Sequence, residues 1–291
     1  MKAFPRIPSA KISALISDVD GTLVTDDKIL TARAQAALTE LRASGILFFI
    51  ISSRPSRGLR MLLPPLGITA PIGSFNGGVL ANPDRSVISE HLLMSQAARR
   101  AIEILTGYGV QPWVFAGQDW LVRNTDGRYI GIEERAVEFP PTVVDDFGPF
   151  LNIAAKIVGV SADFERLAGC ERDVRAVLTG EAAVARSQPY YLDITHPLAN
   201  TGTAFSEIAK LLAVPTADIA VIGDGDNDIA MFERCGLSIA MGNGNPEVRR
   251  AADLVTGSNS DDGFANAVER FILGGVRSNP QVAIAGAAGH T

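Results

Sequence analysis

Residues 14–22 read Ala-Leu-Ile-Ser-Asp-Val-Asp-Gly-Thr, an apolar run that ends in two aspartates and a turn. The apolar run predicts a buried strand, and its carboxyl end is where open α/β sheets bind ligands. The glycine after Asp20 permits a turn that can bring Asp20 back over Asp18. A carboxylate held beside a divalent cation can attack phosphorus while a second carboxylate moves a proton. A solvated turn after a buried strand is the alternative that this segment leaves open.

The composition is that of an ordinary globular chain. Its 291 residues are 47% hydrophobic and 20% charged, enough for one large domain or two smaller ones. The net charge of -6 argues against binding to nucleic acid or an anionic membrane, because both require clustered basic residues. We therefore expect a small-molecule partner. The oligomeric state stays open.

The ends of the chain and its cysteines favour a cytoplasmic location. Residues 1–8 lack the apolar core of a signal peptide, and the longest apolar run, 46–51, is too short to span a bilayer. Cys170 and Cys235 match no metal-ligand spacing, so reduced, buried thiols are expected. Residues 274–291 are rich in Gly, Ala and Ser and are expected to form a flexible tail.

A strand, a helix and a second strand are predicted over residues 14–51. Thr31 is a candidate N-cap and Gly45 a stop signal for a helix over 31–45. The continuous apolar run 46–51 then suits a parallel strand that is covered on both faces. This order is the βαβ unit of a doubly wound sheet.

Polar residues follow the second strand at the same end as the aspartates. Ser52, Ser53 and Arg54 come directly after it. Parallel neighbours end on the same side of a sheet, so these residues are expected at the edge that carries Asp18 and Asp20. Amides and hydroxyls at a helix start there can bind phosphate.

The regular alternation stops after the Asn76-Gly77 turn, which predicts a core split by an insertion. The fold class expected is α/β: a Rossmann-like, doubly wound parallel sheet core over 1–81 and 192–273, with an inserted α+β cap domain over 82–191. Within the insertion, helices are predicted over 95–106 and 161–178, and β-rich segments over 113–115, 120–122 and 154–160. In the second half of the core, helices are predicted over 203–212 and 228–233, and strands over 219–222 and 237–240.

A second acidic cluster repeats the geometry of the first. Residues 223–228 read Gly-Asp-Gly-Asp-Asn-Asp and follow an apolar strand. Carboxylates on two such loops form a site for Mg²⁺, which prefers oxygen ligands and keeps several waters. A calcium loop of the EF-hand type has overlapping spacing, but the distal glutamate and the flanking helix are missing.

The order and spacing of these motifs resemble the haloacid dehalogenase superfamily. The resemblance rests on residues 18–22, 52–54 and 223–228. The Asn76-Gly77 turn, the insertion after it and residues 240–244, 252–256 and 262–263 are similar to the Cof-type phosphatases with a C2 cap. The resemblance spans about residues 12–273. It implies a Mg²⁺-dependent phosphohydrolase for a small phosphorylated metabolite, a sugar phosphate first, with the mannosyl-3-phosphoglycerate phosphatases as relatives to test against.

The resemblance also implies roles for individual residues. Asp18 would be the nucleophile that forms an aspartyl-phosphate, and Asp20 the general acid and later the base. Mg²⁺ would be held by Asp18, the main-chain carbonyl of Asp20 and Asp224, with Asp228 bound through water. The expected phosphate-binding residues are Val19, Ser52, Ser53, Arg54, Asn76, Thr201 and Asn227.

One position departs from the family pattern. A lysine commonly stands where this chain has Thr201, within Ala199-Asn200-Thr201-Gly202-Thr203. A neutral hydroxyl is a weaker partner for phosphate and carboxylate charge than an ammonium. Lys210 is about 13 Å further along the helix and cannot replace it, so Arg54 is the candidate cation.

Three interpretations of Thr201 stay open. The chain is an enzyme that uses another cation, an enzyme weakened by a natural or engineered substitution, or a non-catalytic phosphoester-binding protein. A phosphomutase is a further alternative, since it would pass the same phosphoryl group to a second hydroxyl.

Overall fold

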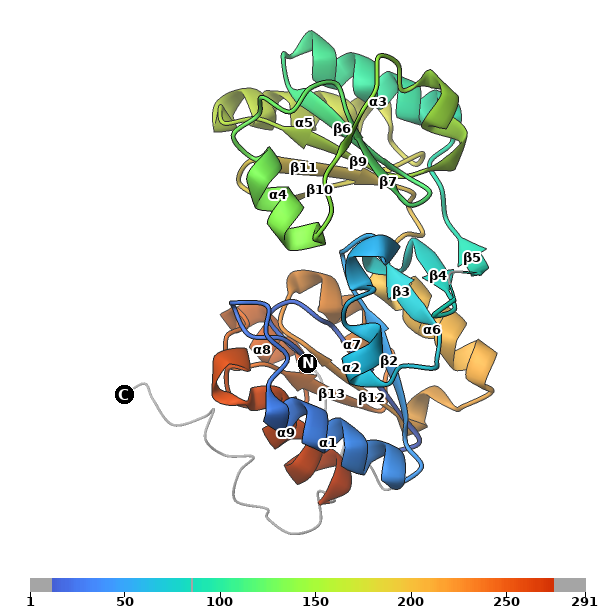
Figure 1. Cartoon of the computed structure of the whole chain (residues 1–291), viewed down its shortest axis with the longest axis vertical. Coiled ribbons are helices and arrows are strands. Elements are labelled where there is room, and N and C mark those ends of the chain that lie inside the picture. Colours follow the sequence, from blue (N-terminus) through green and yellow to red (C-terminus); the bar gives the residue numbers. More distant parts are fainter. Residues whose placement is uncertain (1–11, 85, 275–291) are drawn as a thin grey trace. The chain divides into compact units, whose positions relative to one another are not determined.

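The computed structural model describes residues 12–84 and 86–274 (Figure 1). The chain separates into two compact units. Within the described residues, unit 1 comprises 12–52, 62–71 and 201–274, and unit 2 comprises 53–61 and 72–200. Residues 53–61 and 72–81 thus group with the inserted part, a division different from the expected bounds, which stay a prediction. Apart from Gly274, the expected tail lies outside the described residues.

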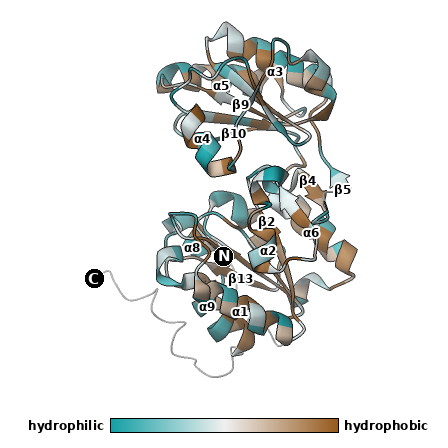
Figure 2. Ribbon diagram, in the orientation of Figure 1, coloured by the Kyte–Doolittle hydropathy of each residue, from teal (hydrophilic) through white to brown (hydrophobic). Residues whose placement is uncertain are grey.

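Unit 1 is built on parallel strands in the order β14-β13-β12-β1-β2. These are β14 (Leu254–Val255), β13 (Leu237–Ala240), β12 (Ile219–Gly223), β1 (Ala14–Ser17) and β2 (Leu47–Ile51). Every residue of β1 and β12 is buried, as expected for apolar strands covered on both faces. Figure 2 shows the hydrophobic colouring of β2 and β13. The α/β fold class predicted from the sequence is confirmed.

The register of β1 brings the ends of the central strands together. Ser17 pairs with Ile222 of β12 on one side and with Ile50 of β2 on the other. The segments that follow β1 and β12 therefore leave the sheet side by side at its carboxyl edge, where α/β sheets bind ligands.

The helices of unit 1 follow local sequence signals. Helix α1 (Ala32–Ala43) begins after Thr31, whose side chain accepts a hydrogen bond from the Ala34 N–H at 3.1 Å, and Gly45 follows it with a φ of +75°. It packs against α9 (Gly263–Ala267). The other helices are α2 (Leu63–Leu66), α6 (Thr201–Leu212), α7 (Ile229–Phe232) and α8 (Pro246–Ala251).

The predicted start of one helix in unit 1 is wrong, and another predicted helix is short. Helix α6 begins at Thr201, two residues before the predicted start. Gly202 lies inside it, where a Cβ would come within 2.9 Å of the Ala230 carbonyl oxygen, so this glycine permits close packing on α7. The helix predicted near 228–233 is the short α7, which Asp228 and Glu233 flank, and a 3₁₀ turn over Asp226–Asp228 precedes it.

Unit 2 contains a six-stranded sheet and three further antiparallel strands. The sheet order is β10-β11-β9-β6-β7-β8, and all its pairs are antiparallel except β7 with β8. The strands are β6 (Gln111–Ala116), β7 (Asp119–Val122), β8 (Thr142–Val143), β9 (Ala154–Val160), β10 (Ala183–Gln188) and β11 (Tyr191–Thr195). The smaller group is β3 (Ile72–Ser74), β4 (Val79–Ala81) and β5 (Val87–Glu90).

The helices of unit 2 cover both faces of its large sheet. Residues of α3 (Ser95–Gly107) and α5 (Phe164–Val177) form one apolar cluster with the sheet, and α4 (Ile130–Val137) joins the other. Helix α5 starts three residues later than predicted because Asp163 caps it, accepting the Arg166 N–H at 3.0 Å. Helix α4 and strands β10 and β11 were not predicted from the sequence.

The structure bears on two further expectations, the burial of the cysteines and the absence of a membrane-spanning segment. Cys170 and Cys235 are free and buried, so the prediction of buried thiols is confirmed. In the part of the chain that the structure describes, no helix has both the length and the apolar composition needed to cross a membrane. The cytoplasmic location stays a prediction.

Candidate active site

The site begins where β1 and β12 end. The Asp18 N–H donates to the Ile222 carbonyl at 3.0 Å, which extends the pairing of the two strands by one residue. Asp18 is therefore fixed directly beside the loop after β12, and its side chain is buried. This position follows from the pairing of β1 with β12, which places the residue after β1 at the carboxyl edge of the sheet.

The loop after β12 is organised around Asp228. Its Oδ2 atom accepts the N–H groups of Asp224 and Gly225, both at 2.9 Å, and the side chain is fully buried. Gly223 leaves the space that this carboxylate occupies, since a Cβ there would lie 2.3 Å from Asp228 Oδ2. The loop thus turns Asp224 and Asp228 toward the same point.

Three carboxylates meet at this edge of the sheet. Asp18, Asp224 and Asp228 each offer an oxygen within 4.8 Å of the others. Burial, and then the charges of Asp228 and Asp224, raise the pKa of Asp18 well above its usual value. Burial also raises the pKa of Asp224 and brings the pKa of Asp228 to about 7. Either protons or a bound cation can neutralise buried like charges, and an all-oxygen donor set suits a hard cation such as Mg²⁺.

The turn after Asp20 locks the first motif onto the second. Gly21 has a φ of +80°, and a Cβ there would lie 2.2 Å from Asp224 Oδ2. The Thr22 hydroxyl donates to Asp224 Oδ1 at 2.8 Å. Asn243 donates through Nδ2 to the Gly21 carbonyl at 2.9 Å and to Asp224 Oδ2 at 3.3 Å. Thr22 and Asn243 were not among the expected site residues, although both lie in the motifs that carry the resemblance.

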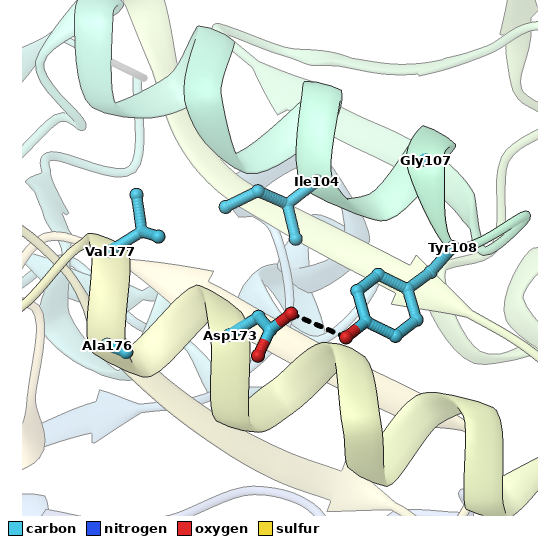
Figure 3. A pocket seen from close by; sticks show the side chains of 6 residues that line it. All are labelled: Ile104, Gly107, Tyr108, Asp173, Ala176 and Val177. Carbon is cyan, nitrogen blue, oxygen red and sulfur yellow. Dashed lines mark hydrogen bonds between the residues drawn. The ribbon is translucent and has the colours of Figure 1, made fainter.

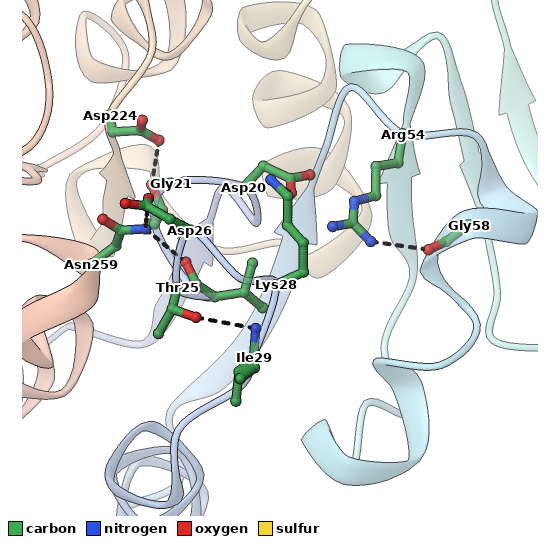
Figure 4. Close-up of polar contacts among 12 residues, drawn as sticks. Asp20, Gly21, Thr25, Asp26, Lys28, Ile29, Arg54, Gly58, Asp224 and Asn259 are labelled. Atoms are coloured by element: carbon green, nitrogen blue, oxygen red, sulfur yellow. Dashed lines mark hydrogen bonds and ion pairs between the residues drawn. The ribbon is translucent and has the colours of Figure 1, made fainter. Parts of the chain in front are cut away.

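Asp20 lies in a different setting from the three clustered acids. Its side chain is 27% exposed, and Oδ1 is 2.7 Å from the ammonium of Lys28 (Figure 4). Asp18 is buried among like charges, whereas Asp20 faces a cation and solvent. Two neighbouring carboxylates in such unlike environments can take different catalytic roles.

Four of the expected phosphate-binding residues belong to unit 1. Ser52 follows β2 and is buried. The buried Thr201 hydroxyl donates to the Asn227 carbonyl, so the start of α6 is held against the acidic loop. Asn227 itself is exposed and donates through Nδ2 to Asp228 Oδ1 at 3.3 Å. Val19 contributes through its backbone: its N–H favours the charged form of Asp18, and its carbonyl accepts from Leu23 at 2.9 Å.

The remaining expected residues belong to unit 2. Arg54 is buried, donates through Nη1 to the Gly58 carbonyl at 3.4 Å, and accepts at its own carbonyl from the Phe75 N–H at 3.0 Å. Asn76 has a φ of 57°, the left-handed turn expected of an Asn-Gly pair. Ser53 is exposed. Within unit 2, therefore, Arg54 and the Asn76 turn lie on adjoining segments.

A groove on unit 2 differs in character from this site. It measures about 410 Å³ and is lined by residues of α3 and α5 and by Tyr108 (Figure 3). Of its lining residues only Tyr108 and Asp173 have polar side chains, and the Tyr108 hydroxyl donates to Asp173 at 2.5 Å. These two polar side chains bond to each other, so the lining of the groove holds no group of functional side chains comparable to the clustered acids.

The comparison with known families agrees with this geometry. The sequence profile of the haloacid dehalogenase-like hydrolases matches residues 15–268. The chain belongs to that family. The resemblance inferred from the motifs is therefore confirmed.

Relatives and solved structures extend the match over nearly the whole chain. The 5-amino-6-(5-phospho-D-ribitylamino)uracil phosphatase YwtE of Bacillus subtilis is 26% identical, over 88% of this chain and 97% of its own. A haloacid dehalogenase-like hydrolase from Bacteroides thetaiotaomicron has a TM-score of 0.83 and 27% identity, over 89% of this chain and 99% of its own. The sugar phosphatase BT4131 shares the fold, with a TM-score of 0.76 and 22% identity over 90% and 99% of the two chains.

Proposed function

We propose that this hydrolase is a Mg²⁺-dependent phosphatase of small phosphorylated metabolites, with sugar and polyol phosphates as the first candidates. The observation that carries the proposal is the buried group of Asp18, Asp224 and Asp228 beside the half-buried Asp20. One acid is positioned to attack, and its neighbour can exchange protons with solvent and substrate.

The reaction proposed has two steps. In the first, an oxygen of Asp18 attacks phosphorus, the bond to the leaving oxygen breaks, and Asp20 gives that oxygen its proton. In the second, Asp20 takes a proton from water, the water oxygen attacks phosphorus, and the bond to Asp18 breaks to release phosphate. When bound, Mg²⁺ would neutralise carboxylate and phosphoryl charge. Asp18, Asp224 and Asp228 are the side chains that would hold it.

The phosphate-binding roles are part of the same proposal. Ser52 and Thr201 place hydroxyls at the starts of segments near the sheet edge, and donors aimed at phosphoryl oxygens stabilise the charge spread over them. Ser53, Arg54 and Asn76, for which the resemblance implies the same role, belong to unit 2, and their part in phosphate binding stays a prediction. The location of Thr201 beside the acidic loop makes it the position at which charge is most simply tested.

The substrate class rests on the relatives. YwtE is named as a phosphatase of a phosphate ester on a ribityl chain, and ribityl is a polyol chain. Mannosyl-3-phosphoglycerate is a further substrate to include. Thr201 favours one alternative, a protein that binds phosphoesters without turnover, because its hydroxyl supplies no charge.

The experiment is a panel of sugar, polyol and aryl phosphates assayed for inorganic phosphate with Mg²⁺ and with a chelator. The native protein is expected to release phosphate only with Mg²⁺. The Asp18→Asn protein should release none, but calorimetry should still show that it binds the phosphate esters when Mg²⁺ is present. Isomer formation without phosphate would indicate a phosphomutase. Ligand binding by the native protein without either product would establish the non-catalytic alternative.

A further inference from the structure

The loop after the first motif is closed by its own hydrogen bonds. The Thr25 N–H donates to the Ile29 carbonyl at 3.0 Å, and the Lys28 N–H donates to the Thr25 carbonyl at 2.9 Å. The Ile29 N–H donates to the Thr25 hydroxyl at 3.2 Å (Figure 4). Residues 25–29 therefore form a compact loop with a defined shape rather than an open connection to α1.

Unit 1 also holds this loop from outside. The buried Asn259 donates through Nδ2 to the Val24 carbonyl at 3.0 Å and to Asp26 Oδ1 at 3.0 Å. Figure 4 shows Asn259 and Asp26 facing one another beside the Gly21 turn. Since the anchoring side chain is itself buried, the loop keeps one position relative to the acids.

Lys28 occupies a strained position in this loop. Its φ is 63°, in the left-handed region that residues with a Cβ rarely adopt. Such outliers persist where the surroundings impose them, and they cluster at functional sites. Here the conformation accompanies an ammonium placed 2.7 Å from Asp20 Oδ1.

The stability that this ion pair contributes does not explain why the loop holds Lys28 beside Asp20. The side chain of Lys28 is 42% exposed and that of Asp20 is 27% exposed, and exposed pairs of this kind contribute little to stability. What the loop achieves is placement: it holds an ammonium directly beside the carboxylate of Asp20.

We propose that Lys28 is a positioning residue for Asp20. The inference rests on the proposed phosphatase function. An ammonium on Oδ1 fixes the orientation of the Asp20 carboxylate and leaves Oδ2 to exchange protons. In the second step Asp20 takes a proton from water, the water oxygen bonds to phosphorus, and the bond from phosphorus to Asp18 breaks, so the carboxylate must be aimed at that water. The first step depends less on Asp20 when the leaving group is a good one, so with an aryl phosphate Lys28 is expected to support the second step more than the first.

The kinetic experiment uses 4-nitrophenyl phosphate, whose leaving group needs little help from an acid. Lys28→Met should lower steady-state turnover about tenfold, a modest share of what acid–base catalysis contributes. A burst of nitrophenol equal to the enzyme concentration should precede the slow phase, because the phosphoenzyme then accumulates. Lys28→Arg should restore most of the turnover. Lys210→Met, which removes an exposed ammonium at the end of α6, should leave turnover unchanged.

A double variant identifies the group through which Lys28 acts. In the Asp20→Asn protein, Lys28→Met should have no further effect. Turnover within twofold of the native value in Lys28→Met, or an equal loss with and without Asp20, would overturn the proposal.

A second measurement does not depend on activity. In protein labelled with ¹⁵N-lysine, the Lys28 ammonium resonance, assigned by its loss in Lys28→Arg, should move in Asp20→Asn. An unmoved resonance would reject the positioning role even in an active enzyme. If the native protein releases no phosphate but the Lys28 resonance does move in Asp20→Asn, the proposed function is rejected and the contact between Lys28 and Asp20 is still supported.

Discussion

Asp18 is the proposed nucleophile, and its charge also destabilises the metal-free fold. Its pKa is raised by burial and by Asp228 and Asp224, so the metal-free protein holds this carboxylate against repulsion. Asp18→Asn should abolish turnover. It should also raise the free energy of unfolding of the chelator-treated protein at neutral pH, because a neutral amide removes both the cost of burying the charge and the repulsion from Asp228 and Asp224.

Urea unfolding with a chelator present is the measurement for Asp18. Asp226→Asn is the matched control, since Asp226 is an exposed acid of the same neighbourhood outside the clustered group. Stability that falls in Asp18→Asn, or that rises equally in both variants, would show that repulsion at the cluster is not the cause.

Thr201 is the position at which the effect of the missing positive charge can be measured. The side chain is buried, and its hydroxyl donates to the Asn227 carbonyl, so an ammonium at this position could reach the acidic loop. Thr201→Lys should raise phosphatase turnover on an aryl phosphate about tenfold, a size typical of one added electrostatic contact in a water-poor site. Thr201→Met supplies similar length without charge and should give no rise. An equal rise in both variants, or none in an active protein, would dismiss the charge explanation.

The residues that sequence reasoning located and those it missed differ in a physical way. Asp18 and Asp224 follow apolar strands directly, so strand pairing alone fixes them at one edge. Lys28 reaches Asp20 only because the loop closes on itself and its backbone turns left-handed. Nothing in the local pattern marks a lysine for that conformation, since it depends on Asn259, more than two hundred residues away in the chain.

At the scale of elements, the turn after β1 couples the two acidic loops. Gly21 and Gly45 have nearly the same backbone, with φ values of +80° and +75°, but a Cβ at Gly45 meets nothing within 4 Å. Gly45→Ala should therefore lose only the backbone preference, about 1 kcal/mol. Gly21→Ala should lose more stability and most of the turnover, because the new methyl group must displace Asp224.

Urea unfolding and phosphate release on both alanine variants test this coupling. Their common backbone strain cancels in the comparison, so the difference reports the contact with Asp224. Equal stability losses with full turnover in Gly21→Ala would mean that the turn is not the link between the two loops.

The helices show where element prediction succeeds and where it stops. Helix α1 was located by its N-cap and its glycine stop, which are local signals. The start of α6 was misplaced because Gly202 serves packing against α7, a contact that the local sequence does not contain. Strands β10 and β11 carry polar and apolar residues in a mixture that only the pairing with β9 resolves.

At the scale of the whole molecule, the sequence indicated a split parallel core and an inserted α+β part, and the structure has a unit of each kind. The exact division depends on contacts of short segments such as 53–61, which pack with residues far along the chain. Periodicity within a segment cannot report such contacts. The assignment of these segments therefore required the three-dimensional structure, whereas the fold class did not.

The whole protein should also respond to pH in a way that reveals the cation. A carboxyl whose pKa is higher in the folded than in the unfolded state stabilises the fold at low pH, and this contribution is lost as pH rises through the folded pKa. For Asp228 the window runs from the ordinary 3.8 to about 7, and Asp18 and Asp224 shift in the same direction. Bound Mg²⁺ would displace these protons.

The melting temperature should therefore fall with rising pH in a chelator, and Mg²⁺ should raise it more at about pH 8 than at about pH 5.5. Scanning calorimetry at both pH values, with millimolar Mg²⁺ or a chelator, measures the two effects. Asp224→Asn should lose most of the Mg²⁺ effect, because it removes one of the three clustered carboxylates. A Mg²⁺ shift of the same size at both pH values, or one retained in Asp224→Asn, would place the cation away from these acids.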